Sequence, residues 1–385
     1  MKLFLLLLFS IVLGLNPRAS AATSQGKYIF YVSTHTEDGG KGKGIYAYRF
    51  DPATAEVTSL GLAAETTNPT FMAIHGNGRI LYSVNELSNY QGLNSGGLSA
   101  FSIDHKTGKL TLLSEVRSRG AGPCYLVVDK AGESLLVANY TGGNVAVFPI
   151  LEDGKLGTAS TVIQYSGHGA NPDRQEGPHP HSIDLSPDNR FAFVDDLGLD
   201  RINLYKFDSS NRSLSANDPP FLKFDAGAGP RHFVLHPSGK FAYVVTEMQS
   251  AVVAFSANLQ TGTLQPLQTI STLPKDFSGV NNDAEIAMHP SGKFLYASNR
   301  GHDSIAVFSI DPSKGTLTAV ETAATKGKEP RHFAIDPTGQ FLFAENLKSD
   351  NIVIFRIDQN TGRLTPTGKV IEVPSPLCLK FVKVE

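Results

Sequence analysis

The sequence lacks the residues that mark several common protein classes. Its 385 residues contain no tryptophan and only two cysteines. The absence of tryptophan excludes repeats defined by a Trp-Asp dipeptide, and two cysteines allow at most one disulfide in a chain of this length. Charge of either sign is not in large excess, because the formal net charge is −2. We therefore expect neither nucleic acid nor an anionic membrane as the main partner.

Long apolar runs are also rare, and the one prominent run lies at the N-terminus. Lys2 precedes the run Leu3 to Leu15, which is short for a membrane span, and Ala19-Ser20-Ala21 has the small-x-small pattern of a cleavage site. The alternative is an N-terminal membrane anchor. We expect residues 1–21 to be a cleaved signal peptide, and the mature protein to be periplasmic or secreted and free of the membrane.

An internal repeat is the strongest feature of the rest of the chain. The segment Gly229-Pro230-Arg231-His232-Phe233 and the later Glu329-Pro330-Arg331-His332-Phe333 each lead into a Pro-x-Gly turn. In each unit the turn residue, usually glycine, lies nine residues after a landmark residue, usually proline. The pairs are Pro69/Gly78, Pro123/Gly132, Pro180/Asn189, Pro230/Gly239, Asp283/Gly292 and Pro330/Gly339. A fixed period of about 50 residues indicates a repeat architecture.

Each unit reads as four antiparallel strands. In one unit, Phe294 to Ser298 is an apolar strand, Ser304 to Ile310 alternates, and Thr316 to Val320 follows an Asp-Pro-x-x-Gly turn. Such segments, bounded by Gly, Pro, Asn and Asp, are typical of propeller blades. The sequence thus predicts an all-β, seven-bladed β-propeller that forms a single domain over residues 22–385.

The two ends of the chain are predicted to share the seventh blade. Lys27 to Glu65 supplies three strands of a unit, and Ser375 to Phe381 supplies the missing first strand, which closes the ring and protects its edges. Cys124 and Cys378 then begin first strands in two blades that have another blade between them. We expect them to be buried free thiols, because their Cα atoms would be too far apart for a disulfide.

The repeat also predicts which side chains meet at one face of the ring. Residues just after the landmark, and residues eight after the turn, lie at the same end of a β-hairpin. The first position after the landmark holds Thr70, Cys124, His181, Arg231, Ala284 and Arg331; the second holds Phe71, Tyr125, Ser182, His232, Glu285 and His332. Eight residues after the turn stand Glu86, Tyr140, Leu197, Glu247, Arg300 and Leu347. Charges clustered beside a channel predict a site for a small polar or anionic ligand.

Three other histidines belong to the opposite face. His75, His236 and His289 lie in the tight turn before the turn glycine. They recur because the turn recurs, and we expect them to bond backbone groups rather than to take part in function.

One insertion, residues 166–181, interrupts the repeat on the charged face. It brings His179 and His181 to the mouth of the channel. Two histidines two residues apart could suggest a metal, but no third ligand follows at metal spacing, so we expect no metal and no cofactor. An ordinary surface loop is the remaining alternative.

At these residues the sequence resembles the seven-bladed propeller lactonase family, which includes propeller-type 6-phosphogluconolactonases and the fungal carboxymuconate lactonising enzyme. The similarity covers essentially the whole mature chain. Its motifs are Asn171-Pro172-x-Arg174-Gln175-Glu176-x-Pro178-His179-x-His181, Asp196-Leu197-Gly198-x-Asp200, Gly229-Pro230-Arg231-His232, Val245-Thr246-Glu247 and Ser298-Asn299-Arg300-Gly301.

The resemblance implies a catalytic group of one histidine, two arginines and one glutamate, which correspond to His181, Arg231, Glu247 and Arg300. For opening a lactone, Glu247 or His181 would act as the acid or base, and the arginines would bind the oxyanion or a substrate anion. No Gly-x-Ser-x-Gly motif indicates a covalent serine mechanism. The expected substrate-binding residues around this group are His179, Arg174, Glu176, Arg331, Glu86 and His232.

Three functions remain open at this point. Hydrolysis of a small-molecule lactone by a monomer is the first; a carboxymuconate-type lactonising enzyme and a non-catalytic binding propeller are the alternatives. Export does not suit a phosphorylated sugar lactone, which is a cytoplasmic metabolite. An unphosphorylated lactone therefore stays open as the substrate.

Overall fold

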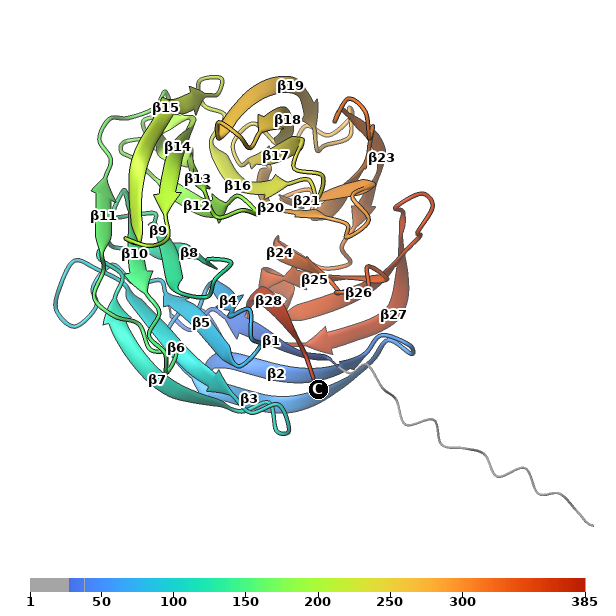
Figure 1. The fold of residues 1–385 in the computed structure, drawn as a ribbon. Helices are drawn as coiled ribbons and strands as arrows, with labels where there is room; N and C mark the ends of the chain where they lie inside the picture. The colour runs from blue at the N-terminus through green and yellow to red at the C-terminus, as the bar shows by residue number, and fades with distance from the viewer. Residues whose placement is uncertain (1–27, 38, 385) are drawn as a thin grey trace, which may run out of the picture.

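The protein is a ring of seven four-stranded antiparallel sheets (Figure 1). The structure, a computed structural model, describes residues 28–37 and 39–384. Within each sheet the strands follow one another from the central channel to the periphery, so that β8, β12, β16, β20 and β24 surround the channel (Figure 1). The predicted fold class is confirmed, whereas the boundary at residue 21 lies outside the described residues.

Six blades are each formed by consecutive strands. The first three consist of β4 (Met72–Ile74), β5 (Ile80–Asn85), β6 (Gly97–Ile103) and β7 (Leu110–Arg117); β8 (Pro123–Val128), β9 (Ser134–Asn139), β10 (Asn144–Pro149) and β11 (Thr161–Gln164); and β12 (Pro180–Leu185), β13 (Phe191–Asp196), β14 (Arg201–Asp208) and β15 (Ser213–Lys223). The next three consist of β16 (Pro230–Leu235), β17 (Phe241–Thr246), β18 (Ala251–Asn258) and β19 (Thr263–Ser271); β20 (Asn282–Met288), β21 (Phe294–Arg300), β22 (Ser304–Ile310) and β23 (Leu317–Ala324); and β24 (Pro330–Ile335), β25 (Phe341–Asn346), β26 (Asn351–Ile357) and β27 (Leu364–Glu372). Single 3₁₀ turns follow β13 and β25, η1 (Leu197–Leu199) and η2 (Leu347–Ser349).

The seventh blade joins the two ends of the chain, as predicted. Its strand order is β28 (Pro376–Lys383), β1 (Tyr28–Thr34), β2 (Gly44–Asp51) and β3 (Glu56–Glu65). β1 pairs antiparallel with β28 from Tyr28 opposite Lys383 to Ser33 opposite Cys378. This pairing closes the ring with backbone hydrogen bonds and leaves no open inner edge.

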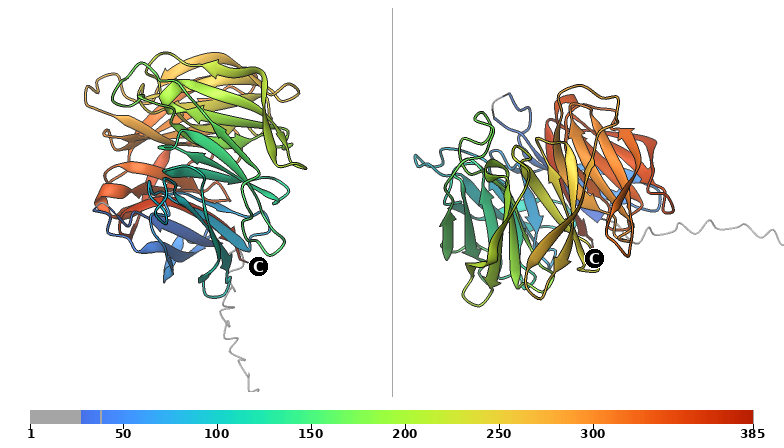
Figure 2. Two further views of the ribbon diagram at one scale, coloured as in Figure 1. Left: turned by 90° about the vertical axis from the view of Figure 1, so that its left-hand side faces the viewer. Right: turned by 90° about the horizontal axis from the view of Figure 1, so that it is seen from above.

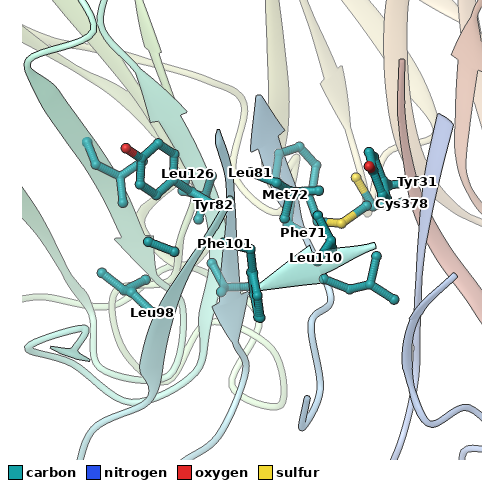
Figure 3. Packing of buried hydrophobic residues seen from close by; sticks show 14 of the residues in the cluster. Tyr31, Phe71, Met72, Leu81, Tyr82, Leu98, Phe101, Leu110, Leu126 and Cys378 are labelled. Carbon is teal, nitrogen blue, oxygen red and sulfur yellow. The ribbon is translucent and has the colours of Figure 1, made fainter. Parts of the chain in front are cut away.

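The blades pack through apolar side chains that lie between neighbouring sheets. Figure 3 shows one such cluster, in which Tyr31 and Cys378 of the shared blade, Met72 and Leu81 of the next, and Leu126 of the one after are all buried. Each fully buried side chain of this size contributes about 1.5–3 kcal/mol. The core is therefore a series of inter-blade layers, which hold the channel walls in register.

The turn between the first two strands of a blade explains the recurring glycine. Gly239 has φ 69° and Gly339 has φ 72°, a left-handed conformation that L side chains adopt at a cost. In the one unit without glycine, Asn189 takes its place with φ 62°, and asparagine tolerates this region better than most residues. The nine-residue spacing in the sequence thus reflects a backbone requirement.

The three turn histidines join neighbouring blades on the face opposite the charged one. His75, His236 and His289 place Nε2 at 3.0, 2.9 and 2.9 Å from the carbonyl oxygens of Gly132, Gly292 and Gly339, each in the next blade. Figure 2 shows the ring from two sides, with loops on both faces. The prediction that these histidines bond backbone groups is confirmed.

Cys124 and Cys378 are buried free thiols, as predicted. Within the residues that the structure describes, no helix is long and apolar enough to cross a membrane.

Candidate active site

A cavity of about 290 Å³ opens at one end of the central channel. Its walls carry mostly polar and charged side chains from six blades, together with Arg174 of the 166–181 insertion. The lining residues are Glu86, Cys124, Tyr140, Arg174, His181, Glu247, Asn282, Arg300 and Arg331. The structure therefore brings together the residues just after the landmark and those eight after the turn, as the repeat register predicts.

A β-bulge explains why two successive residues of a first strand both reach the channel. In β16 the pairing with β17 shifts between Pro230 and His232, and in β24 the same shift occurs between Pro330 and His332. A regular strand would turn alternate residues to opposite faces. Here Arg231 and His232 both line a narrow extension below the cavity.

Glu247 is the centre of the charged cluster, because three arginines converge on its carboxylate. Arg174 Nη2 lies 2.5 Å from Oε1, while Arg231 Nε and Arg300 Nη2 lie 2.9 and 2.8 Å from Oε2. Each arginine comes from a different element, namely the insertion, β16 and the end of β21. Only Arg174 is substantially exposed among them, at 38% of its side chain.

These arginines determine the protonation state of Glu247. Burial alone raises the pKa of a carboxyl group, but the charges of Arg300, Arg231 and Arg174 outweigh it and lower the pKa of Glu247 to about 2. Glu247 is therefore a permanent carboxylate at neutral pH. It can hold and orient arginines, and at this pKa it is a weak base for taking a proton from water.

Arg231 lies one layer deeper than its register suggested. Its side chain is 2% exposed and lines the narrow extension, not the main cavity. Besides its bond to Glu247, its Nη1 donates to the carbonyl oxygen of Ala284 at 2.6 Å and lies 3.2 Å from His232 Nε2. Arg231 thus forms part of the floor of the site.

His181 lines both the main cavity and the extension. Burial lowers the pKa of its imidazole well below the usual range, and the charges of Arg231, His232 and Arg331 lower it further. Its ring packs edge-on against Tyr140 at 5.4 Å and against His232 at 5.1 Å. A neutral imidazole at this place has a free lone pair for accepting a proton.

Arg331 and Glu86 complete the charged wall. Among residues 28–37 and 39–384, Arg331 has no carboxylate within ion-pair distance, unlike Arg174 and Arg300. Glu86 hydrogen-bonds the Thr70 hydroxyl. With three arginines against two glutamates in its lining, the cavity suits a ligand that carries or develops negative charge.

Two residues of the predicted set, His179 and Glu176, line neither the cavity nor its narrow extension. The ring of His179 stacks on Tyr140 at 4.4 Å, and its Nδ1 lies 3.0 Å from the Tyr140 carbonyl oxygen. Glu176 is exposed and places Oε1 3.1 Å from His179 Nε2. Both residues therefore make contacts within the insertion and with Tyr140 and do not face the cavity. Their assignment to substrate binding stays a prediction. His232 is placed in the deeper extension.

Sequence reasoning did not single out three lining residues. The repeat register placed Tyr140 and Cys124 on the charged face, at positions that carry charged residues in other blades, but it gave them no role in the site. Asn282 precedes its landmark residue and has no such signal. In the described part of the chain, residues 28–37 and 39–384, no group of three or more His, Cys, Asp or Glu side chains is arranged to hold a metal ion.

Comparison with known proteins defines the class to which this ring and cavity belong. Residues 29–381 match the family described as "Lactonase, 7-bladed beta-propeller". The chain therefore belongs to this family, and the resemblance seen in the sequence is confirmed.

Individual relatives span nearly the whole chain. A Bacillus subtilis protein named 6-phosphogluconolactonase is 38% identical over 356 residues, covering 92% of this chain and 99% of the relative. A Formosa agariphila protein of the same name is 38% identical over 296 residues, covering 76% and 82%. The solved structure of the periplasmic gluconolactonase of Pseudomonas aeruginosa is 34% identical, with a TM-score of 0.86, and covers 93% of this chain and 100% of that one.

Proposed function

We propose that the protein hydrolyses sugar lactones in the cavity at the end of the channel. The observation that carries this proposal is the convergence of Arg174, Arg231 and Arg300 on Glu247, beside the neutral imidazole of His181. The relatives named 6-phosphogluconolactonase and gluconolactonase favour hydrolysis over a lactonising reaction or a purely binding role.

The chemistry follows from the protonation states of the two central residues. His181 takes a proton from a water molecule as the water oxygen attacks the lactone carbonyl carbon. Negative charge then develops on the carbonyl oxygen, where an arginine such as Arg300 stabilises it. When the ring C–O bond breaks, His181 returns the proton to the leaving alkoxide, and the product is an open-chain acid. Glu247 keeps the arginines in place throughout.

The substrate's substituents are a finer part of the proposal. Arg331 is the lining cation without a carboxylate partner in the described part of the chain, so it would bind an anionic group of the substrate such as a phosphate. A neutral aldonolactone would leave Arg331 exposed to water at the mouth. Both substrates are compatible with a cavity of about 290 Å³.

Export is proposed on the N-terminal pattern of Lys2, the apolar run to Leu15 and Ala19-Ser20-Ala21. The relative from Pseudomonas aeruginosa, named as periplasmic, supports the same location. N-terminal sequencing of the protein from cell fractions tests it. A mature chain beginning near Ala22 outside the cytoplasm is expected, and an intact Met1 in the cytoplasm would contradict it.

Acid release measured by pH-stat tests the reaction. Mature protein is assayed against glucono-δ-lactone, its 6-phosphate and carboxymuconolactone, with the spontaneous rate subtracted. We expect turnover of at least one sugar lactone and a loss of about 100-fold or more in Arg300→Ala. Release at the buffer rate on all three compounds would refute hydrolysis. Acid release that is unchanged in Arg300→Ala would be consistent with hydrolysis but would refute the assignment of the site.

A further inference from the structure

Below the cavity, the channel holds buried ionisable groups that the hydrolysis proposed above does not use. Glu285, His232 and His332 come from β20, β16 and β24, and all three side chains are buried. They line the narrow extension together with Arg231 and His181. A buried carboxylate between two histidines is costly unless its contacts compensate for the lost hydration.

The contacts of Glu285 are directed at the two histidines. Its Oε2 lies 3.3 Å from His232 Nδ1 and 3.3 Å from His332 Nε2. Its other oxygen accepts a hydrogen bond from the Ile286 backbone N–H at 3.1 Å, and its own backbone N–H donates to Ser298 Oγ at 3.0 Å. Across the described chain, neither Oε2 nor His232 Nδ1 makes a hydrogen bond of good geometry with any group, so their 3.3 Å ion-pair contact is the interaction that these two buried atoms share. The contact between them therefore offsets the burial of both.

The other nitrogen of His232 faces the active site. It lies 3.2 Å from Arg231 Nη1. A guanidinium only donates hydrogen bonds, so His232 Nε2 must carry a lone pair and its proton must be on Nδ1, toward Glu285. Burial lowers the pKa of His232 to about 4, although the charge of Glu285 opposes this shift, and the imidazole is neutral at pH 7 as this arrangement requires.

We propose that Glu285 is a positioning residue of the active site, which fixes the ring of His232 so that His232 accepts a hydrogen bond from Arg231. The inference rests on the proposed function only where turnover is the quantity that is measured. Arg231 is held at three points: Glu247 at Nε, and the Ala284 carbonyl and His232 at Nη1. Without the His232 ring in this orientation, Arg231 loses one of these three restraints. The Glu247 carboxylate, which orients the other arginines, is then paired with a less firmly held Arg231.

Turnover by matched variants tests the inference. Glu285→Gln keeps the shape and removes the charge; we expect kcat to fall about 10- to 100-fold with KM changed less than threefold, since a small misplacement of the site is costly. His232→Gln can still accept from Arg231 and donate to Glu285, whereas His232→Leu can do neither. We expect the glutamine variant to retain at least ten times the kcat of the leucine variant. His236→Leu, on the opposite face, is the control and should keep its kcat.

A merely structural role would not give this pattern. If folded Glu285→Gln has a kcat within twofold of the wild type, or if His232→Gln and His232→Leu lose activity equally, the inference is wrong. Should Glu285→Gln fail to fold, the comparison of the two His232 variants decides. In the double variant with His232→Leu, Glu285→Gln should cause no further loss of kcat, because both act through Arg231.

A measurement on Arg231 itself separates this inference from the proposed function. The Nε–H resonance of Arg231, assigned in a nitrogen-15 spectrum by its disappearance in Arg231→Lys, should exchange with water at least tenfold faster in Glu285→Gln. This holds whether or not the wild type hydrolyses a lactone. Equal exchange rates would overturn the positioning role and leave the lactonase proposal intact. A wild type without turnover would overturn the lactonase proposal and leave the positioning role intact.

Discussion

Arg231 and Glu247 form an ion pair that is almost closed to solvent, with Nε and Oε2 2.9 Å apart and exposed side-chain fractions of 2% and 5%. Removing one partner of a buried pair leaves the other charge uncompensated, which costs about 3–5 kcal/mol. Arg300 and Arg174 meet the same carboxylate from the cavity side. The same ion pair therefore contributes both to the stability of the channel wall and to the geometry of the site.

Glu247→Gln should impair both properties. We expect kcat to fall about 100-fold or more and the free energy of unfolding at pH 7 to fall by about 3 kcal/mol. The pKa of Glu247 is lowered to about 2 from an unfolded value of 4.5, so its contribution is present above pH 4.5 and is lost as the pH falls toward 2. Urea unfolding at several pH values should show a shallower acid loss in the variant than in the wild type. Parallel curves would contradict this.

Arg331→Gln should distinguish charged from neutral substrates. Because Arg331 has no carboxylate partner in residues 28–37 and 39–384, its removal leaves no buried anion of these residues unpaired and should leave stability nearly unchanged. We expect KM for a 6-phosphorylated lactone to rise about tenfold or more, with little change for the neutral lactone. Arg331→Lys, which keeps the charge, is the matched control. An equal effect of Arg331→Gln on both lactones would exclude the anion-binding role.

Asp184 should make the protein less stable as the pH rises. It accepts a hydrogen bond from the Tyr125 hydroxyl at 2.9 Å, and burial, with Glu285 nearby, raises its pKa to about 7. In the unfolded chain the Asp184 carboxyl group ionises near pH 3.8, whereas in the folded protein it stays protonated up to about pH 7. The contribution of Asp184 to stability is therefore fully present below pH 3.8 and is lost as the pH rises to about 7. Asp184→Asn should therefore gain about 1–3 kcal/mol relative to the wild type between pH 4 and pH 8. Thermal unfolding at both pH values checks this, and a constant difference would count against it.

The turn histidines should matter for stability alone. His236 Nε2 meets the Gly292 carbonyl of the next blade, and its Nδ1 lies 2.8 Å from the Ser238 hydroxyl. His236→Ala should lower the free energy of unfolding by about 1 kcal/mol, since it removes these bonds. Its kcat and KM should equal those of the wild type. A changed kcat would mean that the two faces are coupled more strongly than the contacts indicate.

The fold could be predicted from the sequence because the repeat imposes the same backbone requirement in each blade. A left-handed residue in the turn fixes the position of Gly239 and Gly339, and asparagine substitutes for it at Asn189. The shared seventh blade followed from counting strands at the two ends. These features are local, so the sequence records them directly.

The details of the site depend on contacts that the repeat does not encode. His179 and His181 are two residues apart, yet only His181 lines the cavity, because the His179 backbone N–H binds Asp196 and its ring stacks on Tyr140. The depth of Arg231 likewise depends on the β-bulge at Pro230. The sequence placed Glu247 correctly at the mouth, but whether it acts as a base or as a partner for arginines depended on how many arginines reach it.

Histidines at the two ends of the channel offer the most direct test of the central claim. The acid-release rate with a sugar lactone is compared among the wild type, His181→Asn and His236→Asn, with unfolding temperatures measured in parallel. If His181 is the proton acceptor, His181→Asn loses about 100-fold or more in kcat while His236→Asn retains it. The pKa of His181 is lowered, so the wild-type rate should be level across neutral pH and fall only in acid. A folded His181→Asn protein with wild-type kcat would contradict the claim.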